Sequence, residues 1–356
     1  FCLGTGNIGK TLFNQLKEQM PFLAANNDLQ VKVAGISNTR KMIFKAEGLS
    51  LEDWENNLDS NGETADLSLF VERMKSMNLP NCVFVDNTAA ESPIEYYQSI
   101  FESSISVVTC NKKGNSADFA QYKSFKDTAR KFGVDFYYET NVGAGLPLID
   151  TIKLLHLSGE NITRIRGVFS GSLSYLFNNF SNEERPFSEV LKEAVDKGFT
   201  EPDPREDLCG NDVARKLLIL ARELDLHNEI EDVKIQNLIP ETLHTVDASE
   251  FLNSFEKMNE EYQTLKNNQL PNHVLRYIGD LHGNLADENG AKLDVKLVSV
   301  PKSSPLGALK GSDSIFEIYT ESYGEQPLVI QGAGAGAQVT ARGVFGDILR
   351  LVEKND

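Results

Sequence analysis

Residues 1–10 read Phe1-Cys2-Leu3-Gly4-Thr5-Gly6-Asn7-Ile8-Gly9-Lys10. This is the pattern of a buried strand that runs into a glycine-rich turn and then into a helix, expected at residues 11–20. Gly4 would allow the tight turn, Gly6 the close approach of a pyrophosphate, and Gly9 the packing of the helix on the strand. Only three residues precede Gly4, against about five or six in an average strand, so we expect the first strand to begin upstream. The pattern favours a dinucleotide-binding fold over an ordinary glycine turn.

Strand and helix signals alternate over the first 140 residues. Strands are expected at residues 31–36, 83–86, 106–109 and 135–138, with helices such as 67–77 and 117–132 between them. This alternation predicts an α/β domain with a Rossmann-like, doubly wound parallel sheet that binds ligands at the carboxyl ends of its strands. We place this dinucleotide-binding domain at residues 1–140, completed by a C-terminal helix at 332–356.

The pattern changes after residue 140. A glycine-rich hinge at 141–147 leads into a helix at 148–157, and alternating segments follow at 162–169, 274–280, 292–300 and 315–319, with helices near 187–197 and 212–224. This order predicts a second, α+β domain at 141–331, with a mixed or antiparallel sheet and helices on one face. The acidic segment 247–268 is expected to form a solvated pair of surface helices. The glycine-rich turn at 331–337 could hold a phosphate or let the last helix pack back on the first domain, and the two roles are compatible.

The composition excludes several classes of protein. The net charge of the 356-residue chain is −17, which argues against nucleic acid and anionic membrane as partners, because both require basic patches. No apolar run approaches the roughly 18 residues needed to span a bilayer, and no signal peptide is visible. The four cysteines, Cys2, Cys82, Cys110 and Cys209, lack the spacing of a zinc site or a disulfide framework. We therefore expect a cytoplasmic enzyme of about two domains.

A highly charged block precedes an apolar helix at residues 200–216, which read Thr200-Glu-Pro-Asp-Pro-Arg-Glu-Asp-Leu-Cys-Gly-Asn-Asp-Val-Ala-Arg-Lys216. Asp212 and Lys216 are four residues apart, so they are neighbours on that helix at the edge of its apolar stripe. Partial burial lowers the pKa of a lysine and a nearby carboxylate raises it, a balance that suits proton transfer. The competing interpretation is an ordinary surface ion pair.

Lys112 is a second candidate. It follows a strand at the ligand-binding edge of the predicted sheet, close to where a nicotinamide would lie, although Lys113 beside it favours a solvated loop. The five histidines show no metal-ligand spacing, and we interpret all of them as structural or surface residues: His156, His227, His244, His273 and His282. This argues against a histidine-based dehydrogenase.

Taken together, these motifs resemble homoserine dehydrogenase. The matching stretches are Gly4-Thr-Gly-Asn-Ile-Gly9, Thr109-Cys-Asn-Lys-Lys113, Thr140-Asn-Val-Gly-Ala-Gly-Leu-Pro147, Phe169-Ser-Gly-Ser-Leu-Ser-Tyr175, and Glu201 to Asp207 with Asp212 to Lys216. The resemblance covers essentially the whole chain. Residues 48–54 are more similar to the dehydrogenase part of bifunctional aspartokinase–homoserine dehydrogenases, which implies an aspartokinase region upstream in the full-length chain.

The resemblance implies reversible NAD(P)-dependent interconversion of L-homoserine and L-aspartate 4-semialdehyde, in threonine and methionine biosynthesis. It makes residues 141–331 the catalytic and dimerisation domain of a homodimer. Lys216 would be the proton donor and acceptor, and Lys112 would help to hold substrate and cofactor. The implied substrate-binding residues are Glu201, Asp207, Asp212 and Gly198. The implied cofactor-binding residues are Gly4, Thr5, Gly6, Asn7, Ile8, Gly9, Arg40, Thr88, Lys112 and Gly336.

The resemblance also implies a structural monovalent cation such as sodium, held by backbone carbonyls. The carbonyls would be those of Glu139, Val142, Ala144 and Leu146. Glu206 and Cys209 depart from the residues that related enzymes often have, but neither position has assigned chemistry, so we expect activity to survive.

The end of the second strand indicates the cofactor preference. NAD-specific sites place Asp or Glu there to bind the ribose hydroxyls. Residues 37–40 are Ser-Asn-Thr-Arg and offer no acid. We therefore expect a preference for NADP, with Arg40 facing the 2′-phosphate, and NAD as a possible second cofactor.

Two other functions stay open. The first is an oxidoreductase that acts on another amino-acid semialdehyde or on a 3-hydroxy acid. The second is a catalytically silent nucleotide-sensing or scaffold module that serves an upstream kinase. The presence of Lys112, Glu201, Asp212 and Lys216 speaks against the silent module, which has no need of the full set.

Overall fold

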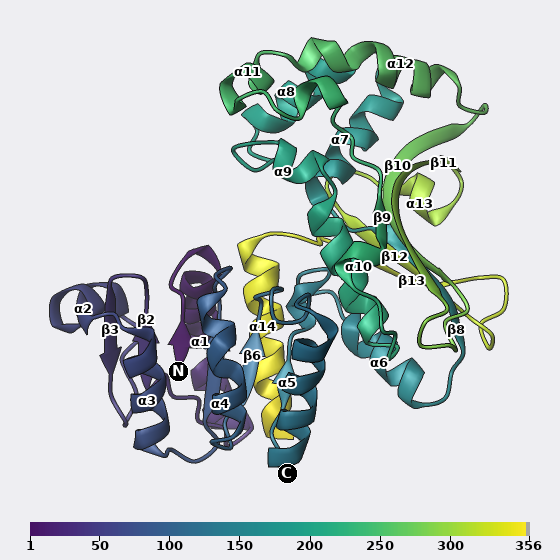
Figure 1. Cartoon of the computed structure of the whole chain (residues 1–356). Coiled ribbons are helices and arrows are strands. Elements are labelled where there is room, and N and C mark those ends of the chain that lie inside the picture. Colours follow the sequence, from purple (N-terminus) through teal and green to yellow (C-terminus); the bar gives the residue numbers. More distant parts are fainter. Residues whose placement is uncertain (354–356) are drawn as a thin grey trace. The chain divides into compact units, whose positions relative to one another are not determined.

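The computed structural model describes residues 1–353 and contains two compact units (Figure 1). The first unit comprises residues 1–145 and the segment that begins at Gly336, and the second comprises residues 146–335. The second unit is therefore an insertion within the sequence of the first. No helix among the described residues has both the length and the apolarity to cross a membrane.

The first unit contains a seven-stranded sheet. Its strand order is β4-β3-β2-β1-β5-β6-β7, with bounds β1 Cys2–Leu3, β2 Gly35–Ser37, β3 Lys41–Phe44, β4 Glu63–Thr64, β5 Val83–Asp86, β6 Ser106–Thr109 and β7 Phe136–Tyr137. Strands β2, β1, β5, β6 and β7 pair in parallel, whereas β3 and β4 add an antiparallel edge. The predicted parallel, doubly wound sheet is confirmed.

The edge beside β2 differs from the expectation. The expected strand at 31–36 is shorter, because the carbonyls of Val33 and Ala34 accept hydrogen bonds from the Leu49 and Lys45 N–H groups (2.8 and 2.9 Å). These residues bond to a loop instead of to a neighbouring strand. The antiparallel strands β3 and β4 were not predicted, since each is short and lies next to polar loop residues. Arg40 consequently lies in the turn of a hairpin.

The helices of the first unit flank this sheet. They are α1 Asn7–Asn26, α2 Trp54–Asn61, α3 Leu67–Met77, α4 Tyr97–Phe101, α5 Phe119–Phe132 and α14 Ala337–Glu353, with 3₁₀ turns η1 Ser92–Tyr96 and η2 Glu139–Asn141. Helix α1 continues beyond its expected end at residue 20, although Pro21 lies inside it. Pro21 is exposed, so solvent can satisfy the carbonyl that its missing N–H leaves without a helical partner.

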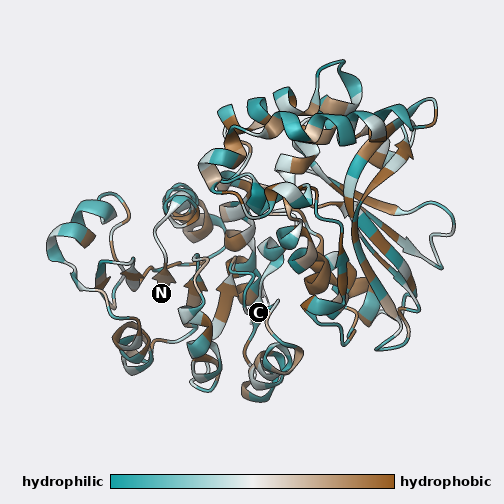
Figure 2. Ribbon diagram, turned by 45° about the horizontal axis from the view of Figure 1, so that its top comes forward, coloured by the Kyte–Doolittle hydropathy of each residue, from teal (hydrophilic) through white to brown (hydrophobic). Residues whose placement is uncertain are grey.

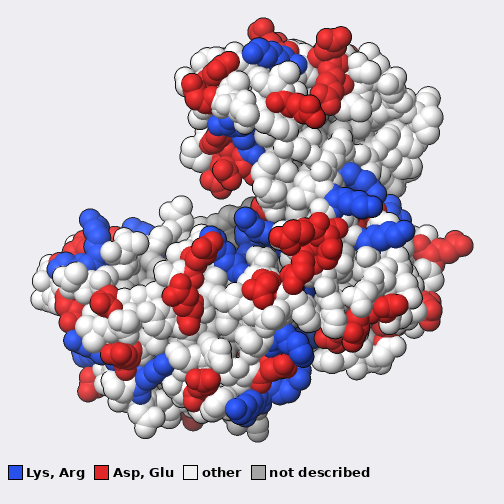
Figure 3. All heavy atoms as spheres, in the orientation of Figure 1, with Lys and Arg blue, Asp and Glu red and all other residues white. Residues whose placement is uncertain are grey.

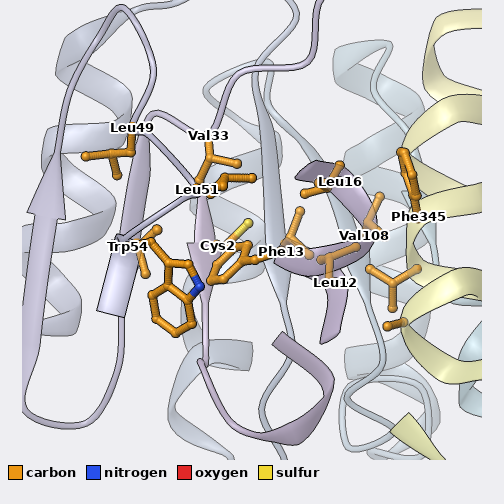
Figure 4. Packing of buried hydrophobic residues seen from close by; sticks show 14 of the residues in the cluster. Cys2, Leu12, Phe13, Leu16, Val33, Leu49, Leu51, Trp54, Val108 and Phe345 are labelled. Atoms are coloured by element: carbon orange, nitrogen blue, oxygen red, sulfur yellow. The ribbon is translucent and has the colours of Figure 1, made fainter. Parts of the chain in front are cut away.

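Apolar side chains from three helices, from strands and from a loop form one hydrophobic cluster of the first unit (Figure 4). Leu12, Phe13 and Leu16 of α1 are buried in it. Trp54 of α2 meets the ring of Phe13 edge-on at 4.8 Å, and Phe345 of α14 belongs to the same cluster. Burying a side chain of this size contributes about 1.5–3 kcal/mol. Helix α14, the last part of the chain to be described, is thus a structural member of the first unit.

The second unit contains a six-stranded mixed sheet. Its order is β13-β12-β8-β10-β11-β9, with bounds β8 Ile162–Val168, β9 Val233–Ile235, β10 His273–Gly283, β11 Ala291–Pro301, β12 Ser314–Thr320 and β13 Leu328–Gly332. All neighbours are antiparallel except β9 and β11, which are parallel. Figure 2 shows hydrophobic colour on these strands, interrupted by hydrophilic residues. The mixed sheet was predicted, whereas β9 and β13 were not.

The helices of the second unit are α6 Ile149–Leu157, α7 Gly171–Asn182, α8 Phe187–Asp196, α9 Arg205–Leu208, α10 Asn211–Arg222, α11 Ala248–Leu252, α12 Asn259–Asn267 and α13 Pro305–Ala308, with 3₁₀ turns η3 Ile230–Asp232, η4 Glu241–Leu243 and η5 Phe255–Met258. The sheet of the second unit has helices packed on both of its faces, α7 and α10 on one and α13 on the other. A Cβ at Gly279 of β10 would meet Leu217 of α10. Val274 and Ile278 lie on the opposite face of β10 and pack with Leu306 of α13. The prediction of helices on one face only was therefore wrong for α13.

The acidic segment 247–268 is not merely a solvated surface. It forms α11, η5 and α12, and it buries Phe251, Phe255, Met258 and Tyr262. The Tyr262 ring stacks on Phe187 of α8 at 3.7 Å. Acidic side chains are prominent on this part of the molecule in Figure 3, and their number concealed an apolar residue at every third or fourth position.

Candidate active site

The glycine turn has the backbone geometry that a dinucleotide requires. A Cβ on Gly9 would lie 2.1 Å from the Gly4 carbonyl oxygen, so no larger residue fits there, and Gly4 itself has a positive φ of 91°. A Cβ on Gly6 would meet nothing within 4 Å. Helix α1 begins at Asn7 without a side-chain cap, which leaves its N-terminus suited to an anionic group. Thr5, Asn7 and Ile8 lie on this same turn, and the residues present fit a pyrophosphate.

The loops after β5 and β6 carry Thr88 and Lys112, both partly exposed. The Thr88 N–H donates to Asp86 Oδ1 (2.8 Å), which fixes the start of its loop. The Lys112 carbonyl accepts hydrogen bonds from the N–H groups of Asn115 and Ser116 (3.1 and 3.0 Å). Both residues lie at the carboxyl edge of the parallel sheet, as predicted.

Arg40 lies exposed in the hairpin turn between β2 and β3. Asn38 Oδ1 accepts the N–H groups of Arg40 and Lys41 (2.8 and 2.7 Å), so the turn is held by its own side chain. The turn at the end of β2 contains no carboxylate.

Gly336 directly precedes α14 and has a φ of 114°. Helix α14 packs along α1, and Gln15 Nε2 donates to the Gln338 carbonyl (2.9 Å). This is the packing expected for the last helix, and the proposed phosphate contact at Gly336 is compatible with it.

Lys216 of α10 is held inside the second unit. Its Nζ lies 2.8 Å from Asp212 Oδ2 and donates to the Phe169 carbonyl (2.9 Å). The Lys216 side chain is only 12% exposed. An exposed i,i+4 pair would leave both side chains in solvent, so the surface-pair interpretation does not describe this lysine.

Asp207 of α9 joins the charged block to the start of α7. Its Oδ1 accepts a hydrogen bond from Ser172 Oγ (2.6 Å), and its Oδ2 accepts the Glu201 N–H (2.9 Å). Burial raises the pKa of the Asp207 carboxyl above 3.8, and the Asp212 charge raises it further, while the two hydrogen bonds and Lys216 lower it. The structure therefore brings Asp207, Asp212 and Lys216 into one cluster.

Glu201 and Gly198 lie on the exposed loop between α8 and α9. The Phe199 ring stacks on Tyr175 of α7 at 4.1 Å, which anchors the beginning of the loop. The Glu201 N–H bond to Asp207 anchors its middle. The Glu201 carboxylate is thus presented from a loop tied down at two points.

The segment proposed to hold a cation has an unusual backbone. Ala144 has a φ of 52° and Gly143 a φ of 80°, so two consecutive residues are left-handed. Glu139 and Val142 are buried beside them, and Leu146 follows. Within residues 1–353, no group of three or more His, Cys, Asp or Glu side chains is placed to hold a metal. A carbonyl site would depend on this backbone rather than on such a group.

Several residues that support the candidate site residues of the two units were not singled out from the sequence. The Ser172 hydroxyl and the Phe169 carbonyl both lie in the motif 169–175, and Asn111 lies next to Lys112. Their importance comes from hydrogen bonds between residues far apart in the chain, for which a single sequence carries no periodic signal.

Two family profiles match the chain. The NAD-binding domain of homoserine dehydrogenase matches residues 4–139, and homoserine dehydrogenase matches residues 147–349. The chloroplastic bifunctional aspartokinase/homoserine dehydrogenase 1 of Zea mays is 42% identical over 352 residues, which cover 98% of this chain and 38% of that protein. The homoserine dehydrogenase of Schizosaccharomyces pombe is 36% identical, and the match covers 99% of this chain and 94% of that protein. The chain thus spans less than half of the bifunctional relative.

Solved structures share the fold. A Candida auris protein of unknown function is 32% identical with a TM-score of 0.87, over 99% of this chain and 97% of that one. A hyperthermophilic archaeal homoserine dehydrogenase in complex with NADPH is 23% identical with a TM-score of 0.74, over 99% and 97% of the two chains.

Proposed function

Because the chain belongs to the homoserine dehydrogenase family of NAD(P)-dependent oxidoreductases, we propose that it interconverts L-homoserine and L-aspartate 4-semialdehyde. The observation that carries the proposal is the placement of Lys216. A largely buried amine, held between Asp212 and the Phe169 carbonyl, has a defined direction from which to exchange a proton.

Lys216 performs the proton transfer in this proposal. During oxidation the hydroxyl proton of homoserine passes to the neutral Lys216 Nζ as the C–O bond gains double-bond character. During reduction the Lys216 ammonium returns that proton to the carbonyl oxygen. When bound, the nicotinamide ring supplies the hydride acceptor or donor. The Phe169 carbonyl and Asp212 keep Nζ in place through both directions.

The acidic residues of the cluster hold the substrate. The Glu201 carboxylate binds the substrate ammonium, and Asp212 acts at the hydroxyl end. Asp207 holds the Glu201 backbone and supports the same cluster, and Gly198 lets the loop approach the substrate closely. Lys112 assists on the side of the cofactor.

The remaining elements of the proposal concern the cofactor and the assembly. The turn at Gly4, Gly6 and Gly9 would bind the pyrophosphate of NADP, and Arg40 would face its 2′-phosphate. A monovalent cation at the carbonyls of residues 139–146 would have a structural role. A homodimer, an aspartokinase region in the full-length chain and a cytoplasmic location are further parts of the proposal; similarity to bifunctional relatives supports the aspartokinase region.

The proposal is tested by following NADP reduction at 340 nm with homoserine as substrate. The Lys216→Ala variant should lose about 10²–10⁴-fold in kcat, the range typical of general acid–base catalysis. Arg215→Ala is the matched control, because Arg215 is the exposed neighbour on the same helix, and it should keep wild-type turnover. A Lys216→Ala enzyme as active as Arg215→Ala would contradict the proposal. If the wild-type enzyme oxidised a 3-hydroxy acid with NADP, or reduced another amino-acid semialdehyde with NADPH, but did not turn over homoserine, the proposed substrate would be wrong.

A further inference from the structure

Asn111 is almost completely buried in the first unit, with 2% of its surface exposed. Its amide is bonded at both ends. The Oδ1 atom accepts the Lys113 N–H (3.1 Å), and Nδ2 donates to Asp86 Oδ2 (3.1 Å) and to the Ala90 carbonyl (2.8 Å). One side chain therefore connects the loop after β6 to the loop after β5.

Asp86 is the other half of this connection. It ends β5, has no exposed surface, and accepts the Thr88 N–H at Oδ1 (2.8 Å). Its Oδ2 also accepts the Tyr97 hydroxyl (2.7 Å), and burial together with the Asp86 charge raises the pKa of that phenol well above 10.0. The carboxyl thus fixes Thr88 with one oxygen and Asn111 with the other.

Asn111 makes hydrogen bonds to the residues on both sides of Lys112. The Asn111 N–H donates to Thr109 Oγ1 (2.9 Å) before Lys112, and Asn111 Oδ1 accepts the Lys113 N–H after it. The backbone at Lys112 cannot turn without breaking one of these bonds. The bonds of Asn111, together with those that the Lys112 carbonyl accepts from Asn115 and Ser116, therefore fix the backbone from which Lys112 leaves the sheet edge.

We infer that Asn111 is a positioning residue for both Thr88 and Lys112, acting with Asp86 as a donor–acceptor pair that links the two loops. The inference rests on the proposed function for the role of Lys112 in turnover. It does not depend on that function for the part that concerns cofactor binding near Thr88.

The polarity of the pair is what matters, and an isosteric change tests it. In Asn111→Asp the side chain can still accept the Lys113 N–H, but it has no N–H to donate and it faces the Asp86 carboxyl. We expect NADPH to bind about 10-fold more weakly, and kcat with homoserine to fall about 100-fold, as is typical when a reacting group is misplaced by about 1 Å.

Exchanging the two side chains restores the bond between them. In the double variant Asp86→Asn/Asn111→Asp the amide at position 86 can donate to the carboxylate at position 111 and to the Tyr97 hydroxyl oxygen, whereas the bond to the Ala90 carbonyl stays lost. The double variant should therefore recover about 10-fold of the lost kcat/KM, which a sum of two independent effects would not do.

The control is Val71→Ala, which removes buried methyl groups from α3, outside the two loops. It should lower the melting temperature but leave the NADPH affinity, measured by fluorescence titration, unchanged. If Asn111→Asp lowers the melting temperature like Val71→Ala and leaves NADPH affinity intact, or if the double variant recovers nothing, the inference is wrong. If wild-type protein binds NADPH but does not oxidise homoserine, the proposed function fails, and the NADPH titrations alone decide the role of Asn111.

Discussion

The glycine turn of the first unit and the charged cluster of the second are two candidate binding regions that are shaped by different kinds of groups. The backbone shapes the turn, and it can do so only because glycine has no side chain: a Cβ on Gly9 would collide with the Gly4 carbonyl. The cluster is shaped by side chains that bond to one another, from Ser172 to Asp207 and from Asp212 to Lys216. Substitutions that add side-chain atoms should therefore impair binding at the glycine turn, whereas substitutions that remove side-chain atoms should impair binding at the charged cluster.

The largest effect is expected from adding one methyl group to the turn. Gly9→Ala places a Cβ 2.1 Å from the Gly4 carbonyl, so the backbone must shift and NADPH affinity should fall at least about 100-fold, with a lower melting temperature. Gly6→Ala is the matched variant, because its Cβ enters open space. It should weaken NADPH binding while leaving the melting temperature of the cofactor-free protein unchanged. A Gly9→Ala protein that binds NADPH as wild type does would break the comparison.

The next effect is expected at the hairpin turn of the first unit. Arg40→Ala should lower the ratio of kcat/KM for NADP to that for NAD by about 10-fold, because a guanidinium–phosphate pair contributes about 1.5–3 kcal/mol and solvent exposure weakens it. Steady-state kinetics with both cofactors measure this ratio. An unchanged ratio would place recognition of the 2′-phosphate elsewhere.

In the second unit a smaller loss should follow from deleting one hydroxyl. Ser172→Ala removes the hydrogen bond to Asp207 Oδ1 and loosens the hold of Asp207 on Glu201, so the KM for homoserine should rise about 5- to 10-fold. Ser172→Thr keeps the hydroxyl and should restore the wild-type KM. Equal KM values for the alanine and threonine variants would show that the bond does not position Glu201.

A still smaller effect separates two glycines of α14. A Cβ on Gly346 meets nothing within 4 Å outside its own helix, so Gly346→Ala should raise the free energy of unfolding by about 0.5–1 kcal/mol. A Cβ on Gly343 would lie 2.5 Å from Thr140 Cγ2 and 3.0 Å from Gly145 Cα, so Gly343→Ala should destabilise. Urea unfolding of the two variants measures whether the free energy of unfolding rises or falls in each. A rise in the Gly343→Ala protein would refute the close packing of α14 against Thr140 and Gly145.

The smallest expected effect is on the pH dependence of stability. Because burial raises the folded-state pKa of Asp207 above 3.8, the folded protein holds this proton more tightly than the unfolded chain. The resulting contribution to stability is complete below pH 3.8 and is lost as pH rises through the folded-state pKa. Asp207→Asn should remove this decline, which melting temperatures between pH 3.5 and 7 would register against wild type. An identical profile for both proteins would contradict it.

Within the first unit the sequence predicts some elements to the residue and misses others. Strands at 83–86 and 106–109 and the helix at 67–77 were predicted to the residue, because strong apolar patterns end there at turn residues. The end of α1 was not predicted correctly. Proline usually ends a helix, but Pro21 faces solvent and α1 continues through it. The two-residue strand β4 has no pattern long enough to be seen.

For the candidate site, the sequence identified the charged residues and missed their supports. Lys112 was singled out from a strand end, Asp212 and Lys216 from helical spacing, and Asp207 only from the family resemblance; the last three do lie together. The partners that hold them, Ser172 and Asn111, became visible only when the fold brought residues 172 and 207, or 86 and 111, within hydrogen-bonding distance. Lys216 likewise donates to the Phe169 carbonyl, which lies between β8 and α7, and its own helix gives no sign of this contact.

The insertion of the second unit has a consequence for how the protein is made. A ribosome synthesises residues 146–335 before it reaches α14, whose Phe345 completes the core around α1. Residues 146–335 can therefore finish folding before the first unit does, because the apolar face of the first unit stays uncovered until α14 is synthesised. A released chain that ends at residue 335 would contain every strand of the second sheet but would lack the helix that completes the core of the first unit.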